Sequence, residues 1–221
     1  MANKIIAFDL DGTIINSSAA EKAHAAWFDL MAKMLGDDSV RQHTGDADYF
    51  PAVLDIMSRL TGLRKEDSFD KSVMVKYARN LYQMMYLAEL KKEGKDAFVP
   101  EMLDMILELK KTCRVALITT APEDMVLPAL EIAGIKKYFD YVYRGPLNQE
   151  PSKLSMLQKF VRDIGKPDLY IGNEKVDADA CKELGINFAL AKWGKHDEDA
   201  GVMAKFNLTS PKQIKGILDL C

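Results

Sequence analysis

The sequence predicts an α/β protein in which a doubly wound parallel sheet carries an all-helical domain inserted after its first strand. One observation is that short apolar runs alternate with helical periodicity through residues 98–221, as strands and helices do around a parallel sheet. A second is that no strand alternation interrupts the helix-rich stretch from about 17 to 97. A third is that polar residues follow three of the apolar runs, at the strand ends where such folds bind ligands. These residues are Asp9, Thr119 and Asn173.

The insert is expected to consist of helices joined by short polar breaks. Ser18-Ala19-Ala20-Glu21 reads as a capping box, and Gly36 offers a stop for the helix that it begins. Two helical runs and a charged hinge follow: Phe50 to Leu60, Val73 to Leu90 and Lys91 to Asp96. A chain of 221 residues can form a core domain with a smaller insert. We therefore expect residues 1–15 and 98–221 to form the core and residues 16–97 to form the cap.

The core is expected to alternate between strands and helices along the chain. The first strand is the apolar run from Lys4 to Phe8. The later strands are expected at Arg114–Ile118, Tyr138–Tyr143, Asp168–Gly172 and Ile186–Ala191. The helices between and after them are expected at Glu101–Lys111, Asp124–Ala133, Lys153–Ile164, Asp179–Leu184 and Pro211–Leu220.

Composition excludes several classes of function. The formal charge of −3 is made of mixed acids and bases without a basic tract, so nucleic-acid binding is not expected. No apolar run is long enough to cross a bilayer, and the first strand begins too early for a signal peptide, so we expect a cytoplasmic protein. Three separated cysteines without a C-x-x-C pair suggest neither a zinc site nor a disulfide framework. The sequence leaves open whether the protein is a monomer or a homodimer.

The stretch Phe8-Asp9-Leu10-Asp11-Gly12-Thr13 carries the clearest chemistry. Two aspartates at i and i+2 on a continuing strand point the same way and repel unless a cation such as Mg²⁺ binds them. Gly12 lets a ligand approach the backbone amides closely. An anionic nucleophile, a neighbouring acid and a metal suit phosphoryl transfer through an aspartyl-phosphate. The alternative is a simple turn after a strand, for which Asp-Gly is a common signal.

This stretch resembles the nucleophile motif of the haloacid dehalogenase superfamily, an apolar run followed by D-x-D-G-T. The position of the insert resembles the superfamily's helical-cap branch, which includes phosphoglycolate phosphatases and beta-phosphoglucomutases. The resemblance implies that Asp9 attacks phosphorus and that Asp11 acts as acid and then base. An acid at position 11 also separates the chain from the dehalogenases of the superfamily, which lack it.

The second and third motifs of the superfamily bind phosphate. Thr119 resembles the Ser or Thr of the second motif, with Thr120 as the neighbouring alternative, and Gly12 would offer a backbone amide. The third motif is a lysine, commonly within K-P-x-P. Here Gln149-Glu150-Pro151-Ser152-Lys153 places a glutamate where that lysine is usual. We expect Lys153, three residues later, to supply the ammonium, although it could also be an ordinary surface residue at a helix start.

The fourth motif, usually G-D-x-x-x-D, is here Gly172-Asn173-Glu174-Lys175-Val176-Asp177. Asn173 replaces the first acid, so an amide oxygen would bind Mg²⁺ without the charge. The resemblance implies a Mg²⁺ site formed by the Asp9 carboxylate, the backbone carbonyl of Asp11 and Asn173, with Asp177 orienting a metal-bound water or Lys153.

The function expected from these motifs is Mg²⁺-dependent hydrolysis of a small phosphorylated metabolite through an aspartyl-phosphate. One alternative is a phosphosugar mutase of the same superfamily. The other is a catalytically weakened member that binds a phosphorylated ligand or a protein partner, which Glu150 and Asn173 would favour.

Aromatic residues of the insert are expected to have structural roles, with functional roles as the alternative. Tyr77, Tyr82 and Tyr86 at helical spacing favour packing against a neighbouring helix over lining a pocket. His24 lies on the first expected helix and could face the site, although a lone helical histidine is more often a boundary residue.

Overall fold

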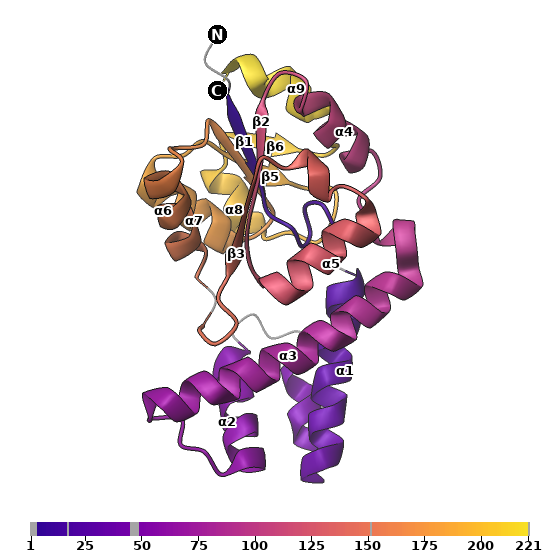
Figure 1. Cartoon of the computed structure of the whole chain (residues 1–221), viewed down its shortest axis with the longest axis vertical. Helices are drawn as coiled ribbons and strands as arrows, with labels where there is room; N and C mark the ends of the chain where they lie inside the picture. Colours follow the sequence, from indigo (N-terminus) through magenta and orange to yellow (C-terminus); the bar gives the residue numbers. More distant parts are fainter. Residues whose placement is uncertain (1–3, 17, 45–48, 151, 221) are drawn as a thin grey trace.

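A six-stranded parallel sheet in the order β3-β2-β1-β4-β5-β6 forms the centre of the molecule (Figure 1). The computed structural model describes residues 4–16, 18–44, 49–150 and 152–220. The chain runs from β1 outward to β3 and then returns to β4 on the other side of β1, so the topological switch lies between β1 and β4. The strands are β1 (Ile5–Phe8), β2 (Arg114–Pro122), β3 (Tyr141–Gly145), β4 (Leu169–Gly172), β5 (Phe188–Ala191) and β6 (Phe206–Leu208). The predicted fold class is confirmed.

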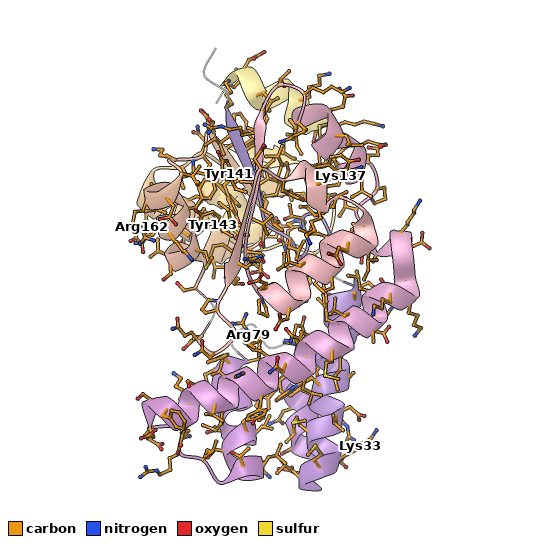
Figure 2. The ribbon with its side chains drawn as sticks, viewed as in Figure 1. Lys33, Arg79, Lys137, Tyr141, Tyr143 and Arg162 are labelled. Carbon is orange, nitrogen blue, oxygen red and sulfur yellow. The ribbon has the colours of Figure 1, made fainter. Side chains whose placement is uncertain are left out.

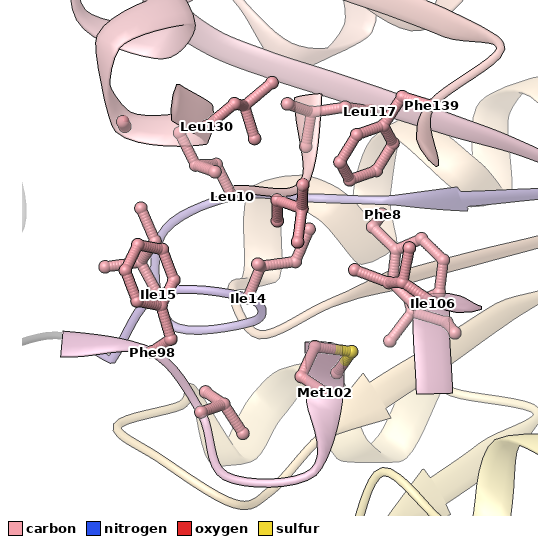
Figure 3. Close-up of a cluster of buried hydrophobic side chains, with 14 of the residues drawn as sticks. Phe8, Leu10, Ile14, Ile15, Phe98, Met102, Ile106, Leu117, Leu130 and Phe139 are labelled. Carbon is pink, nitrogen blue, oxygen red and sulfur yellow. The ribbon is translucent and has the colours of Figure 1, made fainter. Parts of the chain in front are cut away.

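Residues of β1 alternate between two apolar cores, one on each face of the sheet. Ile6 and Phe8 join the cluster that includes Ile106 of α4, part of which Figure 3 shows. Ile5 and Ala7 join the other cluster, under α6 and α7. Because both faces are covered, this strand has no polar position until its carboxyl end, which explains its continuous apolar run.

Helices cover the sheet and form the insert. The α-helices of the insert are α1 (Ser18–Leu35), α2 (Phe50–Thr61) and α3 (Ser68–Glu93). Those of the core are α4 (Met102–Leu109), α5 (Glu123–Ala133), α6 (Lys153–Asp163), α7 (Lys175–Leu184), α8 (Glu198–Met203) and α9 (Gln213–Ile217). Short 3-10 helices lie at Asp38–His43, Gly94–Ala97, Lys136–Tyr138 and Leu218–Leu220. No helix in the described part of the chain is both long and apolar enough to cross a membrane.

The insert has a hydrophobic core of its own. Trp27, Phe28 and Met31 of α1 pack with apolar residues of α2 and α3, in a cluster separate from the two beside the sheet. The two segments that join it to the sheet domain run side by side, where the Asn16 N–H donates to the Ala97 carbonyl at 2.8 Å. The division into residues 1–15 with 98–221 and residues 16–97 stays a prediction, and this pairing lies at that boundary.

Several local expectations differ from the structure. Ser18 is the first residue of α1 rather than the residue before it, and its hydroxyl donates to the Glu93 carboxylate at 3.0 Å across the base of the insert. Helix α7 begins at Lys175 rather than at Asp179, because Glu174 and Asp177 form a capping box there. Strand β6 was not expected, since three residues give too short a pattern to recognise.

Candidate active site

The loop after β1 brings Asp9, Asp11 and Gly12 to the carboxyl end of the sheet. The Asp9 N–H donates to the Ile171 carbonyl of β4 at 2.9 Å, which fixes the start of the loop at the topological switch. Gly12 has a φ of 71°, and a Cβ at this position would overlap the side-chain amide of Asn173. Glycine is therefore required here for two reasons, its backbone angle and the close approach of another side chain.

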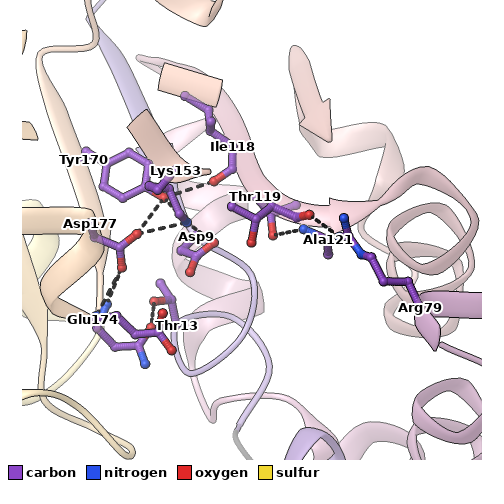
Figure 4. Close-up of polar contacts among 12 residues, drawn as sticks. Asp9, Thr13, Arg79, Ile118, Thr119, Ala121, Lys153, Tyr170, Glu174 and Asp177 are labelled. Atoms are coloured by element: carbon purple, nitrogen blue, oxygen red, sulfur yellow. Dashed lines mark hydrogen bonds and ion pairs between the residues drawn. The ribbon is translucent and has the colours of Figure 1, made fainter. Parts of the chain in front are cut away.

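Lys153 lies between two carboxylates (Figure 4). Its Nζ is 2.6 Å from Asp9 Oδ1 and 2.9 Å from Asp177 Oδ1, and it donates to the Tyr170 hydroxyl at 2.8 Å. The side chain is only 4% exposed, which a lysine tolerates when all three of its donors are used. Ser152 caps α6 by accepting from the Ser155 N–H, so the lysine stands on the first residue of that helix.

Glu150, which aligns with the usual lysine of the third motif, lies elsewhere. Its carboxylate is 3.6 Å from the Lys71 ammonium of the cap, and its side chain is 58% exposed. The structure therefore brings Lys153, rather than Glu150, to Asp9.

Asp177 is enclosed by protein donors. Its Oδ2 accepts the backbone N–H groups of Asn173 at 3.2 Å and Glu174 at 3.1 Å, while Lys153 holds Oδ1. A Cβ on Gly172 would overlap this carboxylate, so glycine makes room for it. With both oxygens engaged and no exposed surface, Asp177 is suited to orient Lys153 and the Asn173 backbone.

Burial dominates the electrostatics of this cluster. It raises the pKa of Asp9 to about 7; Lys153 opposes that shift, and the nearby Asp177 and Asp11 carboxylates add to it. Burial alone would lower the pKa of Lys153, but Asp177 and Asp9 outweigh it and raise that pKa, so the ammonium stays charged. When they are ionised, the carboxylates of the site therefore carry more negative charge than Lys153 neutralises.

The residues expected to hold Mg²⁺ offer only oxygen donors. The Asn173 amide oxygen accepts from the Thr13 hydroxyl at 3.3 Å, which places it beside the loop that carries Asp9 and Asp11. Among the described residues, no three His, Cys, Asp or Glu side chains gather closely enough to hold a metal on their own. The expected set uses a carbonyl and an amide in place of further carboxylates. Oxygen donors next to an excess of negative charge fit a hard divalent cation.

Thr119 and Thr120 lie at the end of β2, beside β1. The Thr119 side chain is buried, and its hydroxyl accepts from the Ala121 N–H at 3.2 Å. The Thr120 carbonyl accepts from Nη2 of Arg79, a residue of α3, at 2.7 Å. Both threonines therefore lie toward the carboxyl ends of the strands, as Asp9 does, and Thr120 also contacts the cap.

Sequence reasoning missed two tyrosines of the site. The Tyr86 hydroxyl of α3 donates to Asp11 Oδ1 at 2.6 Å, although this side chain was expected to serve packing. The Tyr170 hydroxyl accepts from Lys153 and donates to the Ile118 carbonyl at 3.0 Å, which ties the lysine to β2. A tyrosine within an otherwise apolar buried strand is a usable signal, since its hydroxyl needs a partner.

The cap presents further aromatic groups near Tyr86. The Tyr82 and Tyr86 rings have centroids 6.1 Å apart, and the His24 ring lies 5.4 Å from Tyr82 and 4.3 Å from Tyr49. Burial, followed by the charge of Lys195, lowers the pKa of His24, which favours the neutral ring. Tyr77, by contrast, is 60% exposed and lies outside this group.

Comparison with known proteins agrees with this geometry. The family model described as haloacid dehalogenase-like hydrolase matches residues 6–191. The phosphoglycolate phosphatase of Escherichia coli strain K12 is 28% identical over 203 residues, covering 81% of this chain and 77% of that protein. The phosphoglycolate phosphatase of Pseudomonas fluorescens strain Pf0-1 is 26% identical over 198 residues, covering 86% of this chain and 70% of that protein.

Solved structures share the fold at lower identity. The haloacid dehalogenase-like hydrolase SP0104 from Streptococcus pneumoniae superposes with a TM-score of 0.69 at 20% identity, covering 97% of each chain. The HAD-hydrolase YfnB from Bacillus subtilis, described as bound to magnesium, superposes with a TM-score of 0.61 at 15% identity, covering 99% of this chain and all of that one. The resemblance drawn from the sequence motifs is confirmed: the chain is an enzyme that belongs to the haloacid dehalogenase-like hydrolase family.

Proposed function

We propose that this protein is a Mg²⁺-dependent phosphatase that hydrolyses a small phosphomonoester through an aspartyl-phosphate on Asp9. One observation carries the proposal: the Lys153 ammonium lies between Asp9 and Asp177, at the strand ends where phosphate would bind. Phosphoglycolate is the first substrate to test, because the relatives in Escherichia coli and Pseudomonas fluorescens are named as its phosphatases.

Asp9 is suited to act as the nucleophile. Lys153 holds Oδ1, which leaves Oδ2 to form the bond to phosphorus as the bond to the leaving oxygen breaks. Lys153 also lies where it can neutralise charge on the phosphoryl oxygens, and the Thr119 hydroxyl, the Thr120 backbone and the amide of Gly12 can donate to them. Mg²⁺ held by Asp9, the Asp11 carbonyl and Asn173 would polarise the phosphoryl group.

Asp11 is suited to move the proton. In the first step its carboxyl gives a proton to the departing oxygen, and in the second its carboxylate takes one from the water that attacks phosphorus and releases Asp9. Partial burial raises the pKa of Asp11, while the Tyr86 hydrogen bond and Lys153 oppose that shift. Tyr86 holds the carboxyl at its Oδ1, and Asp177 acts on the site only through Lys153 and the Asn173 backbone.

A phosphate-release assay tests the proposal. Wild-type protein is given an aryl phosphate, phosphoglycolate and a panel of small phosphomonoesters, with Mg²⁺ and then with excess chelator. We expect turnover with Mg²⁺, loss of turnover with chelator, and at least about a thousandfold loss of kcat in Asp9→Asn. Folded wild-type protein without turnover across the panel would favour a phospholigand-binding role. Turnover that persists in Asp9→Asn would exclude the aspartyl-phosphate.

A further inference from the structure

Arg79 is a cap residue whose guanidinium reaches the core. It lies on α3 where that helix faces the sheet domain (Figure 2). Its Nη1 donates to the carbonyls of Pro146 at 2.6 Å and Gln149 at 3.0 Å, and its Nη2 donates to the carbonyl of Thr120 at 2.7 Å. The Thr120 acceptor lies in the carboxyl-terminal part of β2, next to Thr119, whereas Pro146 and Gln149 lie in the segment after β3.

The charge of Arg79 has no anionic partner among the described residues. All three acceptors are neutral carbonyls, and two of the five N–H donors of the guanidinium, Nε–H and one on Nη2, are left over. The acids that follow these acceptors in the chain pair with other cations: Glu150 with Lys71, and Glu123 with Arg144. A half-buried cation surrounded only by dipoles is stabilised further when an anion reaches it.

Arg79 is connected to the candidate active site through its hydrogen bond to the Thr120 carbonyl, and the electrostatics of Tyr49 agree with that position. Burial raises the pKa of Tyr49, the Arg79 charge opposes that shift, and the Glu174 and Asp11 charges add to it. The pKa of Tyr49 is therefore sensitive to the charge of Arg79 and to that of Asp11. Figure 4 shows the guanidinium of Arg79 directed toward the segment of β2 that contains Thr119 and Ala121.

We propose that Arg79 recognises a carboxylate on the leaving group of the substrate, so that the preferred substrate is a phosphomonoester with a second anionic group. The inference rests on the proposed phosphatase function. A guanidinium with two spare N–H donors suits a carboxylate, which can accept two hydrogen bonds side by side. Phosphoglycolate has such a carboxylate two carbons from the ester oxygen, whereas ethyl phosphate has the same chain length without it.

The experiment compares these two substrates in wild type, Arg79→Gln and Arg79→Lys. We expect wild type to have the lower KM for phosphoglycolate. In Arg79→Gln the KM for phosphoglycolate should rise about ten- to a hundredfold, as for the loss of a charged hydrogen bond, while the KM for ethyl phosphate stays within about twofold. Arg79→Lys keeps the positive charge but loses the paired N–H donors of the guanidinium, so it should retain part of the preference for phosphoglycolate over ethyl phosphate. Lys76→Gln removes an exposed charge one turn away and should change neither KM.

Three outcomes separate the explanations. Equal losses for both substrates in Arg79→Gln would show that Arg79 only fastens the cap to the core, and would overturn the inference. An equal KM of the wild type for ethyl phosphate and for phosphoglycolate would also overturn the inference, while leaving the phosphatase function intact. Absence of all phosphate release from folded wild type, the aryl phosphate included, would instead be a failure of the proposed function.

A binding measurement gives a readout that does not depend on turnover. In Asp9→Asn, phosphoglycolate should raise the Tm more than ethyl phosphate at the same concentration, because a ligand stabilises the state that binds it. Adding Arg79→Gln to that variant should remove the difference between the two ligands. If the difference persists, the carboxylate is bound by another group.

Discussion

The core side and the cap side of the candidate site differ in how their polar groups are held. On the core side, Lys153, Asp177 and Tyr170 are buried and bonded to one another, with each lysine donor used. On the cap side, Tyr86 donates to Asp11, and two N–H donors of Arg79 have no acceptor in the part of the chain that the structure describes. The core side is therefore organised in advance for charge stabilisation, whereas the cap side contributes only while the cap rests on the core.

The largest effect should come from breaking the core side at Lys153. Lys153→Met leaves Asp9 and Asp177 buried without their cation, so we expect the free energy of unfolding to fall by about 3–5 kcal/mol and phosphatase activity to vanish. Urea unfolding at pH 7.5 measures the first effect. Glu150→Gln, which changes an exposed residue three positions earlier, should shift stability by less than about 0.5 kcal/mol. A Lys153→Met protein as stable as wild type would contradict the arrangement.

An intermediate effect is expected on the cap side at Tyr86. Tyr86→Phe keeps the ring and removes the hydroxyl that holds Asp11, so kcat should fall about ten- to a hundredfold while KM stays nearly constant. The matched control is Tyr82→Phe, which removes a hydroxyl from the neighbouring ring of the same helix. Steady-state kinetics on one substrate suffice. Similar losses in the two variants would assign the effect to packing rather than to the hydrogen bond with Asp11.

The smallest effect concerns the aromatic group of the cap. Since burial and Lys195 lower the pKa of His24 below its ordinary value of 6.5, the unfolded chain binds this proton more readily than the folded one. The stability that the neutral ring contributes is therefore complete above pH 6.5 and is lost as the pH falls from there toward the folded-state pKa. Urea unfolding of wild type and His24→Gln between pH 5.5 and 7.5 should show a difference that shrinks at the acid end. Parallel stability curves would place His24 in contact with solvent.

The fold could be predicted because its signals are local. A buried parallel strand such as β1 is recognised in the sequence as an apolar run, and a helix is recognised by the spacing of its apolar residues. Neither signal depends on residues that are distant in the chain. The first motif could be recognised in the same way, since Asp9, Asp11 and Gly12 are neighbours in the chain. Their roles in catalysis stay predictions.

The third motif was predicted only with an alternative left open, and the contacts of the cap residues with the core were not predicted, for a spatial reason. The start of α6 at Lys153 was predicted from local pattern, but whether Lys153 or Glu150 meets Asp9 depends on how that helix is placed against the sheet, which no local pattern fixes. Tyr86 and Arg79 sit on a long helix where aromatic and basic side chains ordinarily pack or face water. Their spacing of seven residues does place them on one face of α3, and that face meets the core.

The pairing of the two connecting segments has a consequence for how such enzymes can change. Because the chain leaves the sheet domain near Asn16 and returns at Ala97, one backbone hydrogen bond away, a short loop could join these points without moving a strand. On the proposed mechanism, exchanging the cap would alter which leaving group is admitted and would remove the Tyr86 contact with Asp11, while Asp9 and Lys153 stay with the sheet. Substitutions along α3 that spare Tyr86 would then be expected to change the substrate while leaving Lys153 and the proposed nucleophile Asp9 untouched.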